Sequence, residues 1–106
     1  MRRILTVLML AAVSAVAALA ADASAGHMAY DKSCKACHGA DGTPNAAIAK
    51  MLKADMPDLK SAEVQALSND EIKKIVTDGK GKMRPVKTVE GDALDNVIAF
   101  VRTLKK

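Results

Sequence analysis

The residues of this chain that could do chemistry lie together in one short segment. Residues 34–38 read Cys-Lys-Ala-Cys-His, so two thiols stand three positions apart and a histidine follows the second directly. On a helical turn, thiols at this spacing can reach the two vinyl groups along one porphyrin edge and form thioethers. The histidine is then held under the iron and donates one ring nitrogen to it. The pattern predicts one covalently attached haem c, bound through Cys34 and Cys37, with His38 as an axial ligand.

Three other kinds of site use paired cysteines, and each lacks something in this sequence. A thioredoxin-type redox site expects a βαβ pattern, which is absent. A zinc site needs four ligands, and the three residues of the motif would have only His27 to complete them. A disulfide would leave His38 unexplained, as well as the scarcity of aromatic core residues, since the chain has one Tyr, one Phe and no Trp.

A methionine later in the chain is the best candidate for the second axial ligand. Met83 lies in a glycine- and lysine-rich loop, residues 79–85, between two predicted helices. An apolar side chain among cations has a structural reason to be there only if it points inward. The glycines of the loop let its backbone approach the ring edge, and its proline stiffens it. Met56, in a loop before a proline, stays open as the alternative. The other candidates are assigned elsewhere: Met51 to the core, and Met28 and His27 to the helix that leads into the motif, where they have poor reach.

The first 25 residues have the order of a secretory signal peptide. Arg2 and Arg3 precede an uncharged apolar stretch from Ile4 to Ala21, and small residues then allow cleavage after Ala20 or after Ala25. A membrane anchor is the alternative, but the stretch is at the lower edge of what spans a bilayer and its second half is mostly alanine. We therefore expect export to the bacterial periplasm and a mature domain over residues 26–106, with no membrane span after signal removal.

The charge and length of the mature chain exclude several classes of protein. Removing Arg2, Arg3 and Asp22 from the totals of 16 basic and 12 acidic residues leaves 14 and 11, a net charge of +3. So small an excess does not indicate nucleic-acid binding, and 106 residues are too few for a multidomain enzyme.

A run of cations without an acid surrounds the candidate methionine: Lys80, Lys82, Arg84 and Lys87. If Met83 is a ligand, these residues would ring the exposed haem edge and attract redox partners with acidic docking patches. A solvated loop without a docking role accounts for the charges equally well, and both interpretations stay open at this point.

The elements that must position these residues are all helical, because apolar residues recur at helical spacing and nowhere alternate with period two. Four or five short helices are predicted: residues 26–36, a helix capped by Asn45, one or two turns within 61–67, a helix capped by a Ser68–Glu71 box and stopped by Gly79, and a last helix from Asp92 with Leu94, Val97, Ile98, Val101 and Leu104 facing inward.

The chain resembles the small bacterial class I cytochromes c over nearly all of residues 26–106. The resemblance rests on the attachment motif, on Met83, and on two pairs that cross in that family, namely Gly26 and Tyr30 on the first helix and Val97 and Phe100 on the last. It departs from the family at Arg84, which separates the methionine from Pro85, and Pro44 is the loosely aligned candidate for the proline whose carbonyl orients the axial histidine.

The resemblance implies a cytochrome c fold wrapped around one haem and a monomeric, diffusible one-electron carrier, not an enzyme. His38 and Met83 would be the axial ligands, inside an apolar shell of Ile48, Leu52, Ile72, Ile75, Leu94 and Ile98, which could equally be plain core. The alternative function is a haem-based binder or sensor of small ligands with a displaceable sixth ligand. Peroxidase chemistry is a weaker third option, because no distal acid–base pair is evident.

Overall fold

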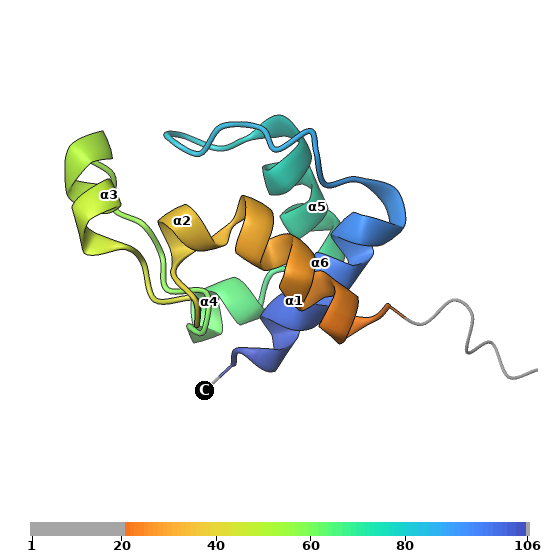
Figure 1. The fold of residues 1–106 in the computed structure, drawn as a ribbon. Coiled ribbons are helices and arrows are strands. Elements are labelled where there is room, and N and C mark those ends of the chain that lie inside the picture. Colours follow the sequence, from red (N-terminus) through yellow and green to blue (C-terminus); the bar gives the residue numbers. More distant parts are fainter. Residues whose placement is uncertain (1–20, 106) are drawn as a thin grey trace, which may run out of the picture.

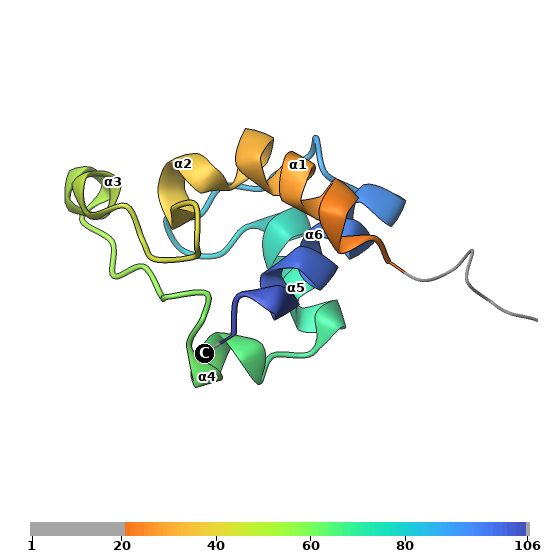
Figure 2. The ribbon, with the colours of Figure 1, turned by 60° about the horizontal axis from the view of Figure 1, so that its bottom comes forward.

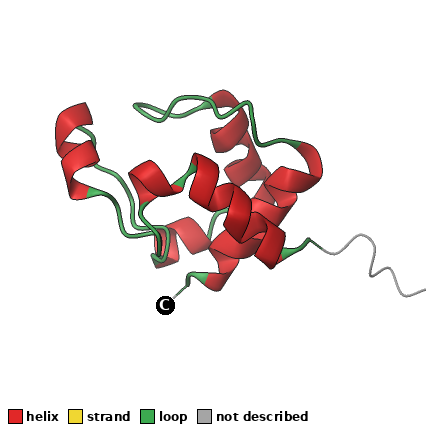
Figure 3. Ribbon diagram, in the orientation of Figure 1, coloured by secondary structure: helices red, strands yellow, loops and turns green. Residues whose placement is uncertain are grey.

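The computed structural model describes residues 21–105, which fold into α-helices joined by loops (Figures 1 and 3). The helices are α1 (Ala23–Ser33), α2 (Lys35–His38), α3 (Ala46–Leu52), α4 (Ala62–Gln65), α5 (Asn69–Asp78) and α6 (Gly91–Thr103). The described part contains no strand beyond an isolated bridge between Lys80 and Met83. The predicted all-α class is confirmed. There is one helix more than the upper prediction because the segment expected as one helix over 26–36 divides at Cys34, where α1 ends and α2 begins.

Helix α1 begins three residues before the predicted start because Asp22 supplies an N-cap. One Asp22 carboxylate oxygen accepts from the backbone N–H groups of Ser24 (2.9 Å) and Ala25 (3.3 Å). The backbone N–H of Asp22 donates to Oδ1 of Asn96 at 2.8 Å, which ties the start of α1 to α6. Most of the predicted signal peptide, residues 1–20, lies outside the described residues. No helix within residues 21–105 is long and apolar enough to cross a membrane.

The predicted caps of α3 and α5 are confirmed. The side chain of Asn45 accepts from the backbone N–H groups of Ala47 (3.1 Å) and Ile48 (3.3 Å) in the first turn of α3. At α5, Ser68 and Glu71 exchange both bonds of the capping box, at 3.1 and 3.2 Å. Gly79 ends α5 with a φ of 80°, a conformation that favours glycine.

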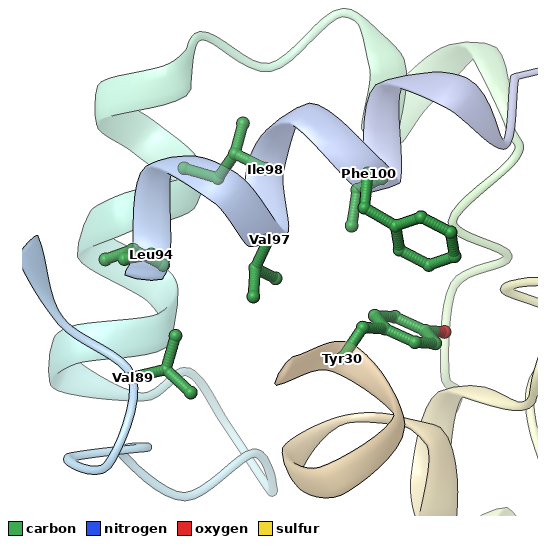
Figure 4. Close-up of a cluster of buried hydrophobic side chains, with 7 residues drawn as sticks. Tyr30, Val89, Leu94, Val97, Ile98 and Phe100 are labelled. Atoms are coloured by element: carbon green, nitrogen blue, oxygen red, sulfur yellow. The ribbon is translucent and has the colours of Figure 1, made fainter. Parts of the chain in front are cut away.

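The core lies where α1 crosses α6, as the resemblance to the cytochromes c implied (Figure 4). A methyl group at Gly26 would lie 1.8 Å from the Asn96 carbonyl oxygen, so only glycine allows this approach. One turn on, Tyr30 is 0% exposed and its ring lies 5.0 Å from the Phe100 ring at a tilt of 57°. Val97 is buried beside them. This close contact fixes the direction in which α1 delivers the chain to Cys34.

Arg102 joins α6 to the segment between α4 and α5. Its guanidinium donates to the carbonyls of Gln65 (2.9 Å) and Leu67 (2.6 Å) and to Oδ1 of Asn69 (2.8 Å). The Gln65 amide in turn donates to the Leu59 and Val101 carbonyls. Arg102 is a basic residue in the last turn of α6, where the helix dipole favours a cation. In the fold it binds the free carbonyls at the end of α4, which a four-residue helix cannot satisfy itself.

The prediction that Met51 belongs to the core is wrong, since its side chain is 69% exposed. Helix α3 lies at the same edge of the molecule in Figures 1 and 2 and makes no extensive contact with another described helix. Its apolar residues Ile48 and Leu52 are only half-buried, and α5 likewise has no fully buried residue. The protein core therefore leaves apolar side chains of α3 and α5 without a full set of neighbours.

Candidate functional site

The two cysteines and the histidine of the motif lie on one helical turn. The Cys34 N–H donates to the Tyr30 carbonyl (2.8 Å) at the end of α1, and the Cys34 carbonyl accepts from Cys37 (3.2 Å) and His38 (2.9 Å). Both cysteines are free thiols and half-buried. The predicted arrangement, with two thiols on a turn and a histidine directly after the second, is therefore formed in the folded chain.

Burial determines the protonation of these groups. It raises the pKa of the Cys34 thiol to about 11, with a smaller contribution from the neighbouring Cys37. It lowers the pKa of His38 below its usual 6.5, because a charged ring would lose its hydration. At neutral pH the ring is therefore uncharged, which is the form that binds metals.

The two ring nitrogens of His38 differ in their surroundings. Nδ1 is buried and has no hydrogen-bond partner among the residues that the structure describes. The orienting bond to the Pro44 carbonyl, for which the sequence offered a loosely aligned candidate, is therefore not formed within residues 21–105. Because Nδ1 is enclosed, a bond from this ring to an iron would fall to Nε2.

Two residues outside the motif bind the backbone of its turn. The Tyr30 hydroxyl donates to the Gly39 carbonyl at 2.7 Å, and burial raises the pKa of this tyrosine to about 12. The Asn45 N–H donates to the Cys37 carbonyl at 2.9 Å, and its side-chain amide donates to the Ala36 carbonyl at 3.3 Å. Sequence reasoning assigned Tyr30 only to packing and Asn45 only to capping. No signal in the sequence pointed to these bonds, because the sequence predicted one helix through Cys34 and the short helix α2 is seen only in the fold.

The chain turns sharply after the motif because Gly39 has a φ of 75°. A methyl group at Gly39 would lie 2.1 Å from the Thr43 carbonyl oxygen. Lys60 holds the far side of this turn, with its ammonium bound to the Thr43 hydroxyl and 3.4 Å from an Asp41 carboxylate oxygen. The turn returns the chain to α2, so that Asn45 reaches the motif.

The loop that carries Met83 is closed by the backbone. Lys80 and Met83 exchange two backbone hydrogen bonds, at 3.0 and 2.9 Å. A methyl group at Gly79 would lie 2.7 Å from the Met83 carbonyl oxygen and 2.9 Å from Cδ of Pro85, so glycine is needed here for the loop's own packing. The Met83 side chain is half-buried, as is that of Met56. In Figure 1 the loop runs above α2, whereas α4 lies below it.

The cations predicted around Met83 are all on the surface. Lys80, Lys82 and Arg84 are exposed and form no ion pair within residues 21–105. Lys87 is also exposed, but its ammonium donates to the Thr77 carbonyl at 2.8 Å near the end of α5. Lys87 therefore has a structural partner, whereas the side chains of the other three form no hydrogen bond or ion pair within residues 21–105.

The predicted apolar shell divides into two parts. Leu94 and Ile98 are fully buried in the α1–α6 core, and Ile72 packs against that core. Ile48, Leu52 and Ile75 lie half-buried outside it. A groove of about 300 Å³ runs along α5, and charged residues (Glu71, Lys74, Asp78 and Lys80) line it together with Leu67, Ile75 and Gly79.

These features fit a haem better than a zinc ion. The turn offers two free thiols, a neutral histidine with one enclosed nitrogen, and apolar side chains that lack neighbours. Within residues 21–105 no three His, Cys, Asp or Glu side chains gather as a metal cluster would require. His27, the only candidate for a fourth zinc ligand, instead stacks on Phe100 at 4.4 Å and lies 3.6 Å from Asp31.

Comparison with known proteins agrees with this geometry. Residues 21–101 match the family model described as subunit III of cbb3-type cytochrome c oxidase. A solved structure, the KustC0563 c-type cytochrome, is 31% identical with a TM-score of 0.64, and the alignment covers 76% of this chain and 98% of that one. A search of curated proteins finds no match. The resemblance to a small c-type cytochrome is confirmed, and the chain belongs to the cbb3-type subunit III family of cytochrome c domains, with a cytochrome c fold and a covalently bound haem c.

Proposed function

We propose that this protein is an exported, periplasmic one-electron carrier, not an enzyme, that serves respiratory or photosynthetic redox partners. The observation that carries the proposal is the turn on which Cys34, Cys37 and His38 lie together in a c-type cytochrome domain. The haem supplies the reversible one-electron change of its iron. Cys34 and Cys37 would hold the haem through their sulfurs, and Nε2 of His38 and the Met83 sulfur would bind its iron.

The surroundings of His38 support its role. Burial keeps the ring neutral at physiological pH, so no proton has to leave before Nε2 can bind iron. With Nδ1 enclosed, only one nitrogen is offered. The ring is therefore prepared for one ligand position and one orientation.

The closure of its loop supports Met83 over Met56. The paired backbone bonds between Lys80 and Met83, with Gly79 packed against the Met83 carbonyl, restrict where the thioether can go. A restrained methionine keeps both axial positions filled, which favours electron transfer over the binding of small ligands. Met56 lies in a segment between α3 and α4 without a comparable closure.

The docking surface is the exposed part of the Met83 loop, made of Lys80, Lys82 and Arg84. Three cations without an acidic neighbour attract an acidic partner and speed its approach, and this attraction weakens with salt. Replacing the three by glutamine should lower the association rate with such a partner and flatten its salt dependence. Lys87→Gln, in which the lost contact is structural, is the matched control. Equal effects of the two changes would contradict this assignment.

The optical spectrum of the haem-loaded protein tests the function. We expect sharp low-spin ferrous bands, a weak far-red methionine-to-iron band in the ferric form, and no response to carbon monoxide. Met83→Ala should abolish the far-red band and admit carbon monoxide, whereas Met51→Ala removes an exposed methionine and should change neither. If Met56→Ala behaves as Met83→Ala was expected to, Met56 is the ligand. Ready binding of carbon monoxide by the parent protein would favour a ligand sensor instead.

A further inference from the structure

Three side-chain rings lie in contact along a line from the surface into the core. The His27 ring of α1 stacks on the Phe100 ring of α6, with ring centroids 4.4 Å apart and planes within 5° of parallel. Phe100 also contacts Tyr30, whose ring centroid lies 5.0 Å away at a tilt of 57° (Figure 4). The exposed fraction falls along this line, from 55% for the His27 side chain to 8% for Phe100 and 0% for Tyr30. We call these three residues the aromatic column.

The inner end of the aromatic column is hydrogen-bonded to the haem-attachment motif. The Tyr30 carbonyl accepts from the Cys34 N–H at 2.8 Å, and Cys34 is one of the two residues that would hold the haem. The Tyr30 hydroxyl donates to the Gly39 carbonyl at 2.7 Å, and Gly39 directly follows His38. Tyr30 is therefore one hydrogen bond away from a residue that carries the haem and one from the neighbour of the axial ligand.

The outer end of the aromatic column opens on a surface with little net charge. Met28, next to His27, is 69% exposed, which is rare for so large an apolar side chain in this fold. Asp31, 3.6 Å from the His27 ring, and Lys32 are also exposed, so one acid and one cation offset each other there. This surface differs from the loop around Met83, whose three exposed cations have no acidic neighbour.

The packing of the core accounts for only part of the aromatic column. The crossing of α1 and α6 explains why Tyr30 meets Phe100. It does not explain His27, because a ring that remains more than half in water buries little apolar area. What the stacked His27 does provide is an unbroken series of contacts from solvent to the residues around the haem.

Such a series of contacts matters for electron transfer. The rate at which an electron tunnels through a protein falls exponentially with distance. Covalent bonds, hydrogen bonds and rings in van der Waals contact couple a donor to an acceptor better than gaps do. The aromatic column supplies two ring contacts, and Tyr30 then supplies hydrogen bonds to Cys34 and Gly39.

We propose that the aromatic column is a second electron-transfer route, with His27 as its surface end. It serves a redox partner that contacts His27 and Met28 through an apolar face without strong net charge. One electron moves along the route, and no bond or proton changes place. The proposal rests on the proposed function, because it takes the haem as a one-electron centre. It adds a point of electron exchange on α1, separate from the loop around Met83.

A ruthenium label on His27 tests the route in the haem-loaded protein. A pentaammineruthenium group bound to the exposed imidazole stands in for a partner that has docked there. A flash-excited photosensitiser with a sacrificial donor reduces the label to Ru(II). The label then passes one electron to the ferric haem and returns to Ru(III), and the absorbance of the haem gives the rate.

Phe100→Leu removes the middle ring and keeps an apolar side chain in the core. We expect the rate from the His27 label to fall several-fold, because the contacts that the ring made on both sides are lost. In the unlabelled ferrous protein, the proton resonances of the His27 ring should also move, because they lose the ring current of Phe100. If Phe100→Leu does not fold, Phe100→Met replaces it, since the flexible methionine fills irregular core space.

Two controls separate the route from a general loosening of the core. Ile98→Val alters a buried residue of α6 outside the aromatic column and should leave the rate from the His27 label unchanged. The double variant His27→Gln/Lys32→His moves the label along α1 to an exposed position outside the column. Adding Phe100→Leu to it should leave the rate from that label unchanged, which also excludes a changed haem potential as the cause.

The proposal is overturned if removing the Phe100 ring leaves the rate from the His27 label unchanged. It is equally overturned if the rate falls as far in Ile98→Val, or from the label at position 32. Unmoved His27 resonances in Phe100→Leu would show that the stack is not formed in solution.

Failure of the proposed function would be recognised separately. A parent protein that binds carbon monoxide readily, or whose spectrum lacks the methionine band, contradicts the electron carrier. The rate from the His27 label still reports on the aromatic column in that case, because the measurement needs only an attached haem that the label can reduce.

Discussion

Replacing Gly26 by alanine tests the contact that positions the whole site. In a helix, alanine is favoured over glycine by up to about 1 kcal/mol, so local propensity alone predicts a more stable protein. At Gly26 the added methyl group would lie 1.8 Å from the Asn96 carbonyl oxygen and 2.9 Å from the Val97 nitrogen. Both atoms belong to the backbone of α6, so no side-chain rotation relieves the clash. The helices must separate by more than about 1 Å at their crossing point.

The steric cost outweighs the gain in propensity. Overpacking typically costs about 1–3 kcal/mol, and here a backbone shift also loosens Tyr30 against Phe100. We expect Gly26→Ala to destabilise the protein by at least about 3 kcal/mol, and therefore to lower the Tm by roughly 12–24 °C in a domain of this size. Thermal and denaturant unfolding of the haem-loaded protein, followed by circular dichroism, measure this loss.

Gly91→Ala is the matched control for this substitution. Gly91 has a φ of 57° but open space around its Cβ position, so alanine there costs only the backbone strain of about 1–2 kcal/mol. A Gly26→Ala protein that unfolds within about 1 kcal/mol of the parent would refute the close crossing of α1 and α6. An Ala variant more stable than the parent would mean that helix propensity decides at this position.

Three further predictions follow from the fold. Arg102→Ala should destabilise the protein by about 2–3 kcal/mol, because three hydrogen bonds to the α4–α5 segment are lost. Lys105→Ala, on the exposed end of the chain, should leave denaturant unfolding unchanged. Equal losses of stability in the two variants would contradict the structural role of the Arg102 hydrogen bonds. Burial raises the pKa of Tyr30 from 10.0 to about 12, so the unfolded chain loses this proton at a lower pH than the folded protein does. The stability that this residue contributes is therefore full below pH 10 and should be lost as the pH rises toward 12. Tyr30→Phe should make this alkaline decline in stability shallower, and an unchanged slope in alkaline denaturation would refute the prediction. Signal cleavage is expected after Ala20, because cleavage after Ala25 would remove the Asp22 cap and the first residues of α1; the intact mass of the exported protein decides between the two sites.

The chemistry of the site could be predicted from the sequence because it resides in contiguous residues. Cys34, Cys37 and His38 fall on one turn whatever the rest of the fold does, since their spacing matches a helical repeat. Caps are equally local, so Asn45 and the Ser68–Glu71 box stand where they were predicted. The pairing of Gly26 with α6 came from the resemblance to a family, and the packing confirms it.

The sequence could not determine which residues far apart in the chain contact one another in the fold. Met51 has helical apolar spacing, yet it is exposed because α3 makes no extensive contact with another described helix. Arg102 donates a hydrogen bond to Gln65, 37 positions before it, and Tyr30 donates one to Gly39, nine positions after it. No periodicity in the sequence predicts such pairs. The sequence by itself determined which groups can hold a haem, because covalent spacing is a property of the chain. Only the tertiary structure decided how His38 is held, because the donors on either side of it come from α1 and from the start of α3, and folding alone brings them to one turn.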